Sequence, residues 1–118
     1  MYGLPSSFDP SVFVGRELEL VCFSVNTITL TFDQKIRVTI LRSFIYHPSP
    51  NAEAIKQTLP VASSTLMCLT GKIVRSAKAD RDGTLTIQFE SRESLTLVDE
   101  LRGYDSYTLQ IGDEEIVV

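Results

Sequence analysis

The residues best suited to chemistry in this sequence are a single histidine, His47, and two cysteines, Cys22 and Cys68. They lie far apart in the sequence, and no CxxC, HxH or HExxH spacing occurs, so the sequence predicts no metal site. A histidine that acts as a catalytic base needs a nucleophile and an orienting group, and the sequence assigns neither to His47. We therefore expect a surface-loop histidine and two packed, reduced thiols.

Asp80-Arg81-Asp82-Gly83 is the strongest local motif, and it resembles the start of a calcium-binding loop. Such a loop ends in a glutamate at its twelfth position, where this chain has Ser91. Asp-Gly between two alternating apolar runs is instead typical of a tight hairpin turn, because glycine adopts positive φ without strain. The motif therefore predicts a turn.

Paired carboxylates, which could do acid–base chemistry, occur at Glu17 and Glu19 and at Glu90 and Glu93. Acids at alternate strand positions are more often solvated surface. The sequence also contains no glycine-rich phosphate loop and no GxSxG elbow. We expect no enzyme and no cofactor, although a catalytic site made from scattered residues would leave no spacing to recognise.

Acidity is concentrated in the last part of the chain. The 118 residues carry a net charge of −4, and the stretch from Asp99 onward carries −5, from six acids and Arg102. An isoelectric point near 4.9 argues against nonspecific nucleic-acid binding. An acidic tail serves either simple solubility or the recognition of a basic protein. The candidate partner-binding residues are Asp99, Glu100, Asp105, Asp113, Glu114 and Glu115.

Two stretches of the sequence, residues 15–41 and 71–98, share one pattern of strand, turn, strand, turn, strand. Gly15-Arg16 matches Gly71-Lys72, and Thr29-Leu30-Thr31-Phe32 matches Thr86-Ile87-Gln88-Phe89 after one inserted residue. The apolar residues in these runs recur at every second position, which predicts antiparallel strands with one solvent-exposed (wet) face and one buried (dry) face. Phe32 and Phe89 fall on the dry faces, which argues against an RNA-binding sheet with exposed aromatics.

The segments outside the two copies predict a linker and a final hairpin. Residues 50–69 are expected to form a helical linker with a short helix over residues 65–69. The sequence leaves open whether residues 52–59 add one or two helical turns. Residues 42–46 either extend the third strand or begin a loop. A hairpin is expected over residues 106–118, outside the repeat.

The predicted fold class is mainly β with a small α linker, in one domain spanning residues 1–118. Two pseudo-symmetric three-stranded antiparallel units should pack their dry faces as a sandwich or a partly open barrel, and a C-terminal hairpin should follow. No apolar run approaches the length of a membrane span, and residues 1–12 lack the features of a signal peptide. We therefore expect a cytoplasmic protein with no membrane partner.

Four segments carry a resemblance to a family of short bacterial proteins of unknown function. The family has two copies of a G-[RK]-x-[VL] strand, each followed by a DGxLxLxF hairpin, then a YExW/Y-x-I/L strand and a G…IV end. This chain has Tyr107 where many members of that family have Trp, and its linker at residues 47–62 is longer. The matching segments are Gly15 to Leu18, Leu66 to Val74, Asp82 to Phe89 and Tyr104 to Leu109.

Proteins of this kind resemble small acidic proteins encoded near secreted toxins, some of which serve as immunity proteins. The resemblance implies a protein partner and supplies no catalytic residues. We therefore expect a small acidic binding protein that neutralises a cognate bacterial toxin by direct protein–protein contact. The alternative is a small-molecule-binding domain or a minor enzyme that uses the cleft between the two repeats. The sequence leaves the oligomeric state open.

Overall fold

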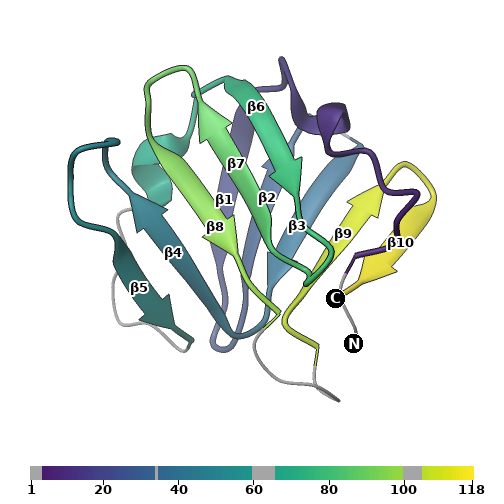
Figure 1. Ribbon diagram of the computed structural model, residues 1–118. Coiled ribbons are helices and arrows are strands. Elements are labelled where there is room, and N and C mark those ends of the chain that lie inside the picture. Colours follow the sequence, from purple (N-terminus) through teal and green to yellow (C-terminus); the bar gives the residue numbers. More distant parts are fainter. Residues whose placement is uncertain (1–3, 34, 60–65, 100–104) are drawn as a thin grey trace.

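The computed structural model describes residues 4–33, 35–59, 66–99 and 105–118, and ten strands within them form two antiparallel sheets packed face to face (Figure 1). The first sheet has the order β1-β2-β3-β9-β10, with bounds Leu18–Phe23, Ile28–Phe32, Ile36–Ile40, Tyr107–Ile111 and Glu114–Val117. The second has the order β5-β4-β8-β7-β6, with bounds Ile55–Thr58, Ser43–His47, Ser94–Leu97, Leu85–Phe89 and Val74–Ala79. The expected mainly-β sandwich is confirmed.

Each sheet combines one three-stranded copy with a hairpin from the other half of the chain. The β4–β5 hairpin follows β3 but pairs with β8 in the second sheet, and β9–β10 follows β8 but pairs with β3 in the first. Both hairpins are therefore part of the two sheets, and the pattern of five strands occurs twice along the chain. Buried Ser43 and buried Ser106 occupy matching positions at the start of each crossing hairpin.

The expected helical linker is not present over residues 52–59, which contain a strand. Ile55–Thr58 form β5, in which Ile55 pairs with Tyr46 and Thr58 with Ser43. The edge of β4 offers ladder hydrogen bonds that outweigh a weak local preference for helix. The same pairing decides whether residues 42–46 extend the third strand or begin a loop. They do neither, because Ser43–His47 form a separate strand, β4. The described end of the linker is a 3₁₀ helix, η2 (Leu66–Leu69), and residues 60–65 lie outside the described residues.

A β-bulge sits at the same place in both copies and sets which side chains face the core. Leu18 pairs with Phe32 but Leu20 already pairs with Thr31, so one extra residue enters β1. The bulge inverts the alternation that the sequence suggests. Leu20 is 55% exposed and Cys22 is exposed, whereas Val21 packs against the core. The bulge of β6 lies between Val74 and Ser76 and likewise brings Val74, Ala77 and Ala79 to one side.

Matching phenylalanines from the two copies meet at the centre of the core. The rings of Phe32 and Phe89 stack with centroids 6.4 Å apart. Phe13, from the 3₁₀ helix η1 (Pro10–Phe13), packs its edge on Phe32 at 5.4 Å. All three are fully or almost fully buried, and burying each such side chain contributes about 1.5–3 kcal/mol. The space between the repeats, at these residues, is therefore filled by the core.

Candidate functional site

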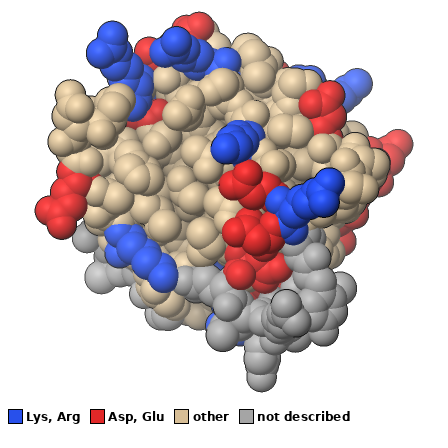
Figure 2. All heavy atoms as spheres, in the orientation of Figure 1, with Lys and Arg blue, Asp and Glu red and all other residues tan. Residues whose placement is uncertain are grey.

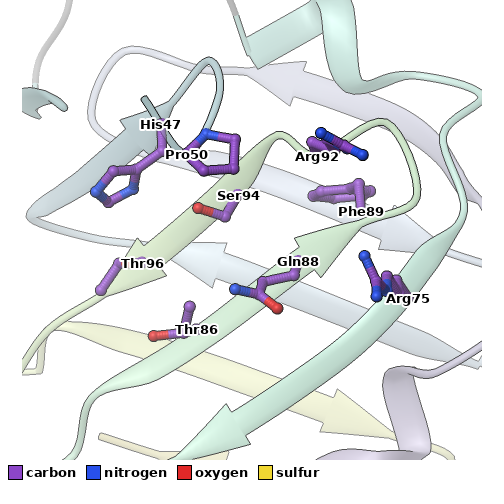
Figure 3. A pocket seen from close by; sticks show the side chains of 9 residues that line it. All are labelled: His47, Pro50, Arg75, Thr86, Gln88, Phe89, Arg92, Ser94 and Thr96. Carbon is purple, nitrogen blue, oxygen red and sulfur yellow. The ribbon is translucent and has the colours of Figure 1, made fainter. Parts of the chain in front are cut away.

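The candidate site is a hollow of about 480 Å³ on the outer face of the second sheet, on the side away from the core. Figure 2 shows this face as a broad uncharged area with charged side chains around its margin. Strands β4, β8, β7 and β6 supply most of the lining (Figure 3). The lining residues are His47, Pro50, Arg75, Thr86, Gln88, Phe89, Arg92, Ser94 and Thr96.

Strand register places the polar lining residues in two rows that cross the sheet. Thr96 of β8 pairs with Thr86 of β7, and Ser94 pairs with both Gln88 and His47. Neighbouring strands lie about 4.8 Å apart, so the side chains in a row are close neighbours. All of them point outward because Leu95, Leu97, Ile87 and Phe89 take the alternate positions and fill the core.

Two arginines complete the site from positions where regular strand geometry is interrupted. Arg75 lies between Val74 and Ser76, at the bulge of β6, and Arg92 has a φ of 77° in the turn between β7 and β8. Bulges re-aim a side chain, and a non-glycine residue in the left-handed region costs about 1–2 kcal/mol. Figure 3 shows Arg75 and Arg92 at the same end of the hollow, on either side of Phe89, with His47 at the other end.

The chemistry of the lining favours binding of an anion. It combines two guanidinium groups, an imidazole, three hydroxyls and an amide, and none of its residues is acidic. Arginine presents a planar fork of donors that matches carboxylate, sulfate and phosphate oxygens. Hydroxyl and amide groups both donate and accept hydrogen bonds, so they can orient the remaining polar groups of a ligand.

His47 is the last residue of β4, so the expectation of a surface-loop histidine is wrong. The pairing with Ser94 places a hydroxyl beside the imidazole, as in a nucleophile–base pair. However, the Nδ1 atom of His47 is buried and has no hydrogen-bond partner among the described residues. In a catalytic triad a partner at that nitrogen orients the ring, and the described residues supply none to His47.

The predicted acidic residues do not form one patch. Asp113, Glu114 and Glu115 are exposed at the turn and edge strand of the β9–β10 hairpin. Asp105 precedes β9 and is therefore at its other end, about 17 Å away along a five-residue strand. Asp99, after β8, is half-buried and accepts a hydrogen bond from Ser106 Oγ at 3.4 Å. Glu100 lies outside the described residues.

A second polar cluster joins η2 to the second sheet. The Tyr46 hydroxyl donates to Glu93 Oε2 at 2.5 Å, and the Cys68 thiol donates to the same oxygen at 3.3 Å. Burial raises the pKa of Glu93, but hydrogen bonds from Tyr46, Ser91 and Cys68 outweigh it and hold that pKa below its ordinary value.

Burial also raises the pKa of the Cys68 thiol, which makes it a poor nucleophile at neutral pH. Burial is again the largest cause for Tyr46, and with the hydrogen bonds to Cys68 and Glu93 it moves the pKa of the phenol far above its ordinary value. The expectation of packed thiols is wrong for Cys22, which is exposed. Cys68 is exposed as a residue, but its thiol lies against Tyr46 and Glu93.

No family model, curated protein or solved structure matches this chain. The resemblance to short bacterial proteins and to immunity proteins therefore stays a prediction. Within the described residues, no helix is long and apolar enough to cross a membrane. No group of three or more metal-ligating side chains gathers anywhere in that part of the chain either.

The residues that line the hollow do not stand out in the sequence, because several of them lie at positions where the two copies differ. Arg75 stands where the first copy has Glu19, and Ser94 stands where it has Arg37. These differences give the second sheet a hollow with arginines at one end and no acid. The available signal was the contrast between the outward positions of the two copies.

Proposed function

We propose that this protein is a non-catalytic binding module that holds an anionic ligand on the outer face of its second sheet. One observation carries the proposal. Arg75 and Arg92 lie at one end of a hollow of about 480 Å³, on either side of Phe89, and the remaining lining is mostly polar and contains no carboxylate.

The geometry accounts for both affinity and orientation. A hydrogen bond between a guanidinium and an oxyanion contributes about 1.5–3 kcal/mol, and two arginines can share one anionic group. Ser94, Thr96 and Gln88 lie on neighbouring strands and can contact the uncharged part of the ligand. The protein carries a net charge of −4, so anions bind only where cationic groups are gathered locally.

The proposal is tested by titrating the protein with sulfate, phosphate and acetate while recording amide NMR spectra. We expect shifts centred on β7, β8 and the turn that holds Arg92. Each of Arg75→Gln and Arg92→Gln should weaken binding about tenfold, because each removes one charge-assisted contact.

Arg37→Gln is the matched control, since Arg37 is an exposed arginine in the first sheet at the position equivalent to Ser94. Equal losses in all three variants, or shifts centred on the first sheet, would show that the anion is held elsewhere.

A second candidate function is the neutralisation of a basic toxin by direct contact, as an immunity protein. It is supported by Asp113, Glu114 and Glu115, which are exposed at the start of β10 and in the turn before it. Among the described residues, β10 is an edge strand of the first sheet. Charges of this kind steer association with a basic surface and make its rate depend on salt. A toxin gene beside this one and a pull-down from the native lysate would test the partner.

Charge reversal then locates the contact. Replacing Asp113, Glu114 and Glu115 with lysine should abolish toxin protection and slow association. Replacing Asp105, at the far end of β9, should leave both unchanged. Loss of protection in both variants would point to overall charge and not to this hairpin. We also propose a cytoplasmic location for either function, which cell fractionation tests.

A further inference from the structure

The hollow does not end at β7. A second depression of about 410 Å³ shares Thr86 and Gln88 with the first and continues over β6 to Ser76, Lys78 and Asp80. The two depressions together form one trough on the outer face of the second sheet.

The trough runs across the strands. In one row His47 pairs with Ser94, Ser94 with Gln88, and Gln88 with Ser76. In the next row Thr96 pairs with Thr86, and Thr86 with Lys78. The first row crosses four strands, which gives it a length of about 14 Å at 4.8 Å per strand. A ligand that fills the trough would therefore be extended and would lie perpendicular to the strands.

This direction argues against an extended peptide. A peptide that adds to a sheet lies along an edge strand and pairs its main chain there. The main-chain groups of β7 and β8 are already used, because each strand has a partner on both sides. The ligand can therefore contact only side chains, and it needs a polar group opposite each strand that it crosses.

The side chains of the trough select for a chain of hydroxylated units. Serine and threonine hydroxyls and the glutamine amide both donate and accept, which complements sugar hydroxyls. Phe89 is the only Phe, Tyr or Trp residue in the lining and is 1% exposed, so the trough offers no large aromatic face on which a neutral sugar can stack. Arg75 and Arg92 flank the trough, and Lys78 stands at its β6 end beside Asp80, with which it forms an ion pair at 3.9 Å. The two arginines therefore supply most of the attraction for anionic groups on the units, and Lys78 adds to it where a ligand carboxylate displaces Asp80.

We propose that the ligand is an acidic oligosaccharide, built of uronic acid units, that lies across β4, β8, β7 and β6. This inference rests on the proposed function, and it adds the ligand class and the direction of the chain. One carboxylate is held between Arg75 and Arg92, and a further one reaches Lys78.

The test is calorimetry with a uronic acid as monomer, dimer and tetramer, with the neutral tetramer of the same linkage and with an acidic glutamate peptide. We expect the acidic tetramer to bind at least about tenfold more tightly than the monomer, and the neutral tetramer to bind at least about tenfold more weakly than the acidic one. Arg75→Gln should weaken monomer and tetramer alike, because both use the first anion position.

Lys78→Gln separates the two positions. It should weaken the tetramer and leave the monomer unchanged, because only a longer chain extends from the two arginines to Lys78. Lys35→Gln is its control, since Lys35 is an exposed lysine outside the second sheet.

Each other outcome is decisive. If simple anions and the monomer bind at Arg75 and Arg92 but the tetramer binds no more tightly, the oligosaccharide is excluded and the proposed function stands. If the glutamate peptide matches the tetramer and responds to the same variants, the occupant is a peptide and the inference is overturned. If neither anions nor saccharides bind, the proposed function falls with it.

Discussion

Glu17 and Ile73 form an antiparallel bridge, and each is the counterpart of the other in the duplicated sequence. The surrounding backbone hydrogen bonds come in matching pairs, so the pseudo-twofold axis passes between these two residues. The pairs are Gly15 N–H to Val74 O at 2.8 Å with Gly71 N–H to Leu18 O at 2.7 Å, and Leu18 N–H to Lys72 O with Val74 N–H to Arg16 O, both at 2.9 Å. The bridge ties the two sheets together along one edge of the sandwich.

The glycines beside this bridge should be equally sensitive to substitution. Gly15 and Gly71 have φ values of 82° and 86°, and a Cβ at either would meet nothing within 4 Å. The cost of Gly→Ala is therefore backbone strain alone, about 1–2 kcal/mol of unfolding free energy at each site. Urea denaturation measures it. Gly→Asn should cost less, because asparagine tolerates this conformation, and equal costs for Ala and Asn would contradict the strain account.

The stacked rings at the centre should be energetically coupled. In a double-mutant cycle of Phe32→Leu and Phe89→Leu, the coupling free energy should be about 0.5–1.5 kcal/mol, because each ring loses its aromatic partner. Thermal or urea unfolding provides the four stabilities. Phe23→Leu is the control, since Phe23 is 38% exposed on an edge strand and should be additive with either change. Additivity between Phe32 and Phe89 would mean that the stack contributes no more than burial.

The exchanged hairpins make the two halves of the chain interdependent. Residues 1–60 expressed alone should be unfolded or aggregated, because β4 loses β8 and β3 loses β9. Mixing that fragment with residues 61–118 should restore the circular dichroism and the cooperative melting of the intact chain. A fragment of residues 1–60 that melts cooperatively as a monomer would show that one copy folds alone.

The cluster at Glu93 should make stability depend on pH in the acid range. Its pKa in the folded protein lies below the ordinary value of 4.5, so the unfolded chain binds the proton more tightly. Its contribution is therefore present above pH 4.5 and is lost as the pH falls through the folded value. Glu93→Gln should be less stable than the natural chain at pH 7, and the difference in unfolding free energy should shrink as the pH falls below 4.5.

Glu90→Gln, an exposed change in the same turn, is the control for that experiment, and it should shift stability equally little at both pH values. A Glu93→Gln difference that stays constant from pH 7 to strongly acid conditions would contradict the proposed role of the Tyr46 and Cys68 hydrogen bonds.

The sequence predicts correctly those strands whose own residues alternate between apolar and polar. In β2 and β7 the apolar residues alternate without interruption, and the structure buries the expected ones, such as Leu30 and Ile87. In β1 the alternation of Leu18, Leu20 and Cys22 suggests that all three face the core, but the bulge turns Leu20 and Cys22 outward. The bulge depends on pairing with β2, so it cannot be recognised from the residues of β1 alone. β5 was missed for a related reason, since its residues form a strand only beside β4.

The candidate site was beyond the reach of sequence patterns for the same reason. His47, Arg75 and Arg92 are distant in the chain, and they share a hollow only because β4 crosses to the second sheet and a bulge and a turn aim the two arginines. The acidic residues, by contrast, are neighbours in sequence, and the structure separates Asp105 from Asp113 by the length of β9.

By itself the sequence determined the duplication, the three central strands of each copy, their dry faces and the absence of a recognisable catalytic or metal-binding motif. Period-two alternation and turn residues are local properties, so they can be read from neighbouring positions. Tertiary structure alone decided the exchange of hairpins, the bulges and the polar trough. These depend on which strand edges pair over long separations, and that choice is made by the packing of the whole core.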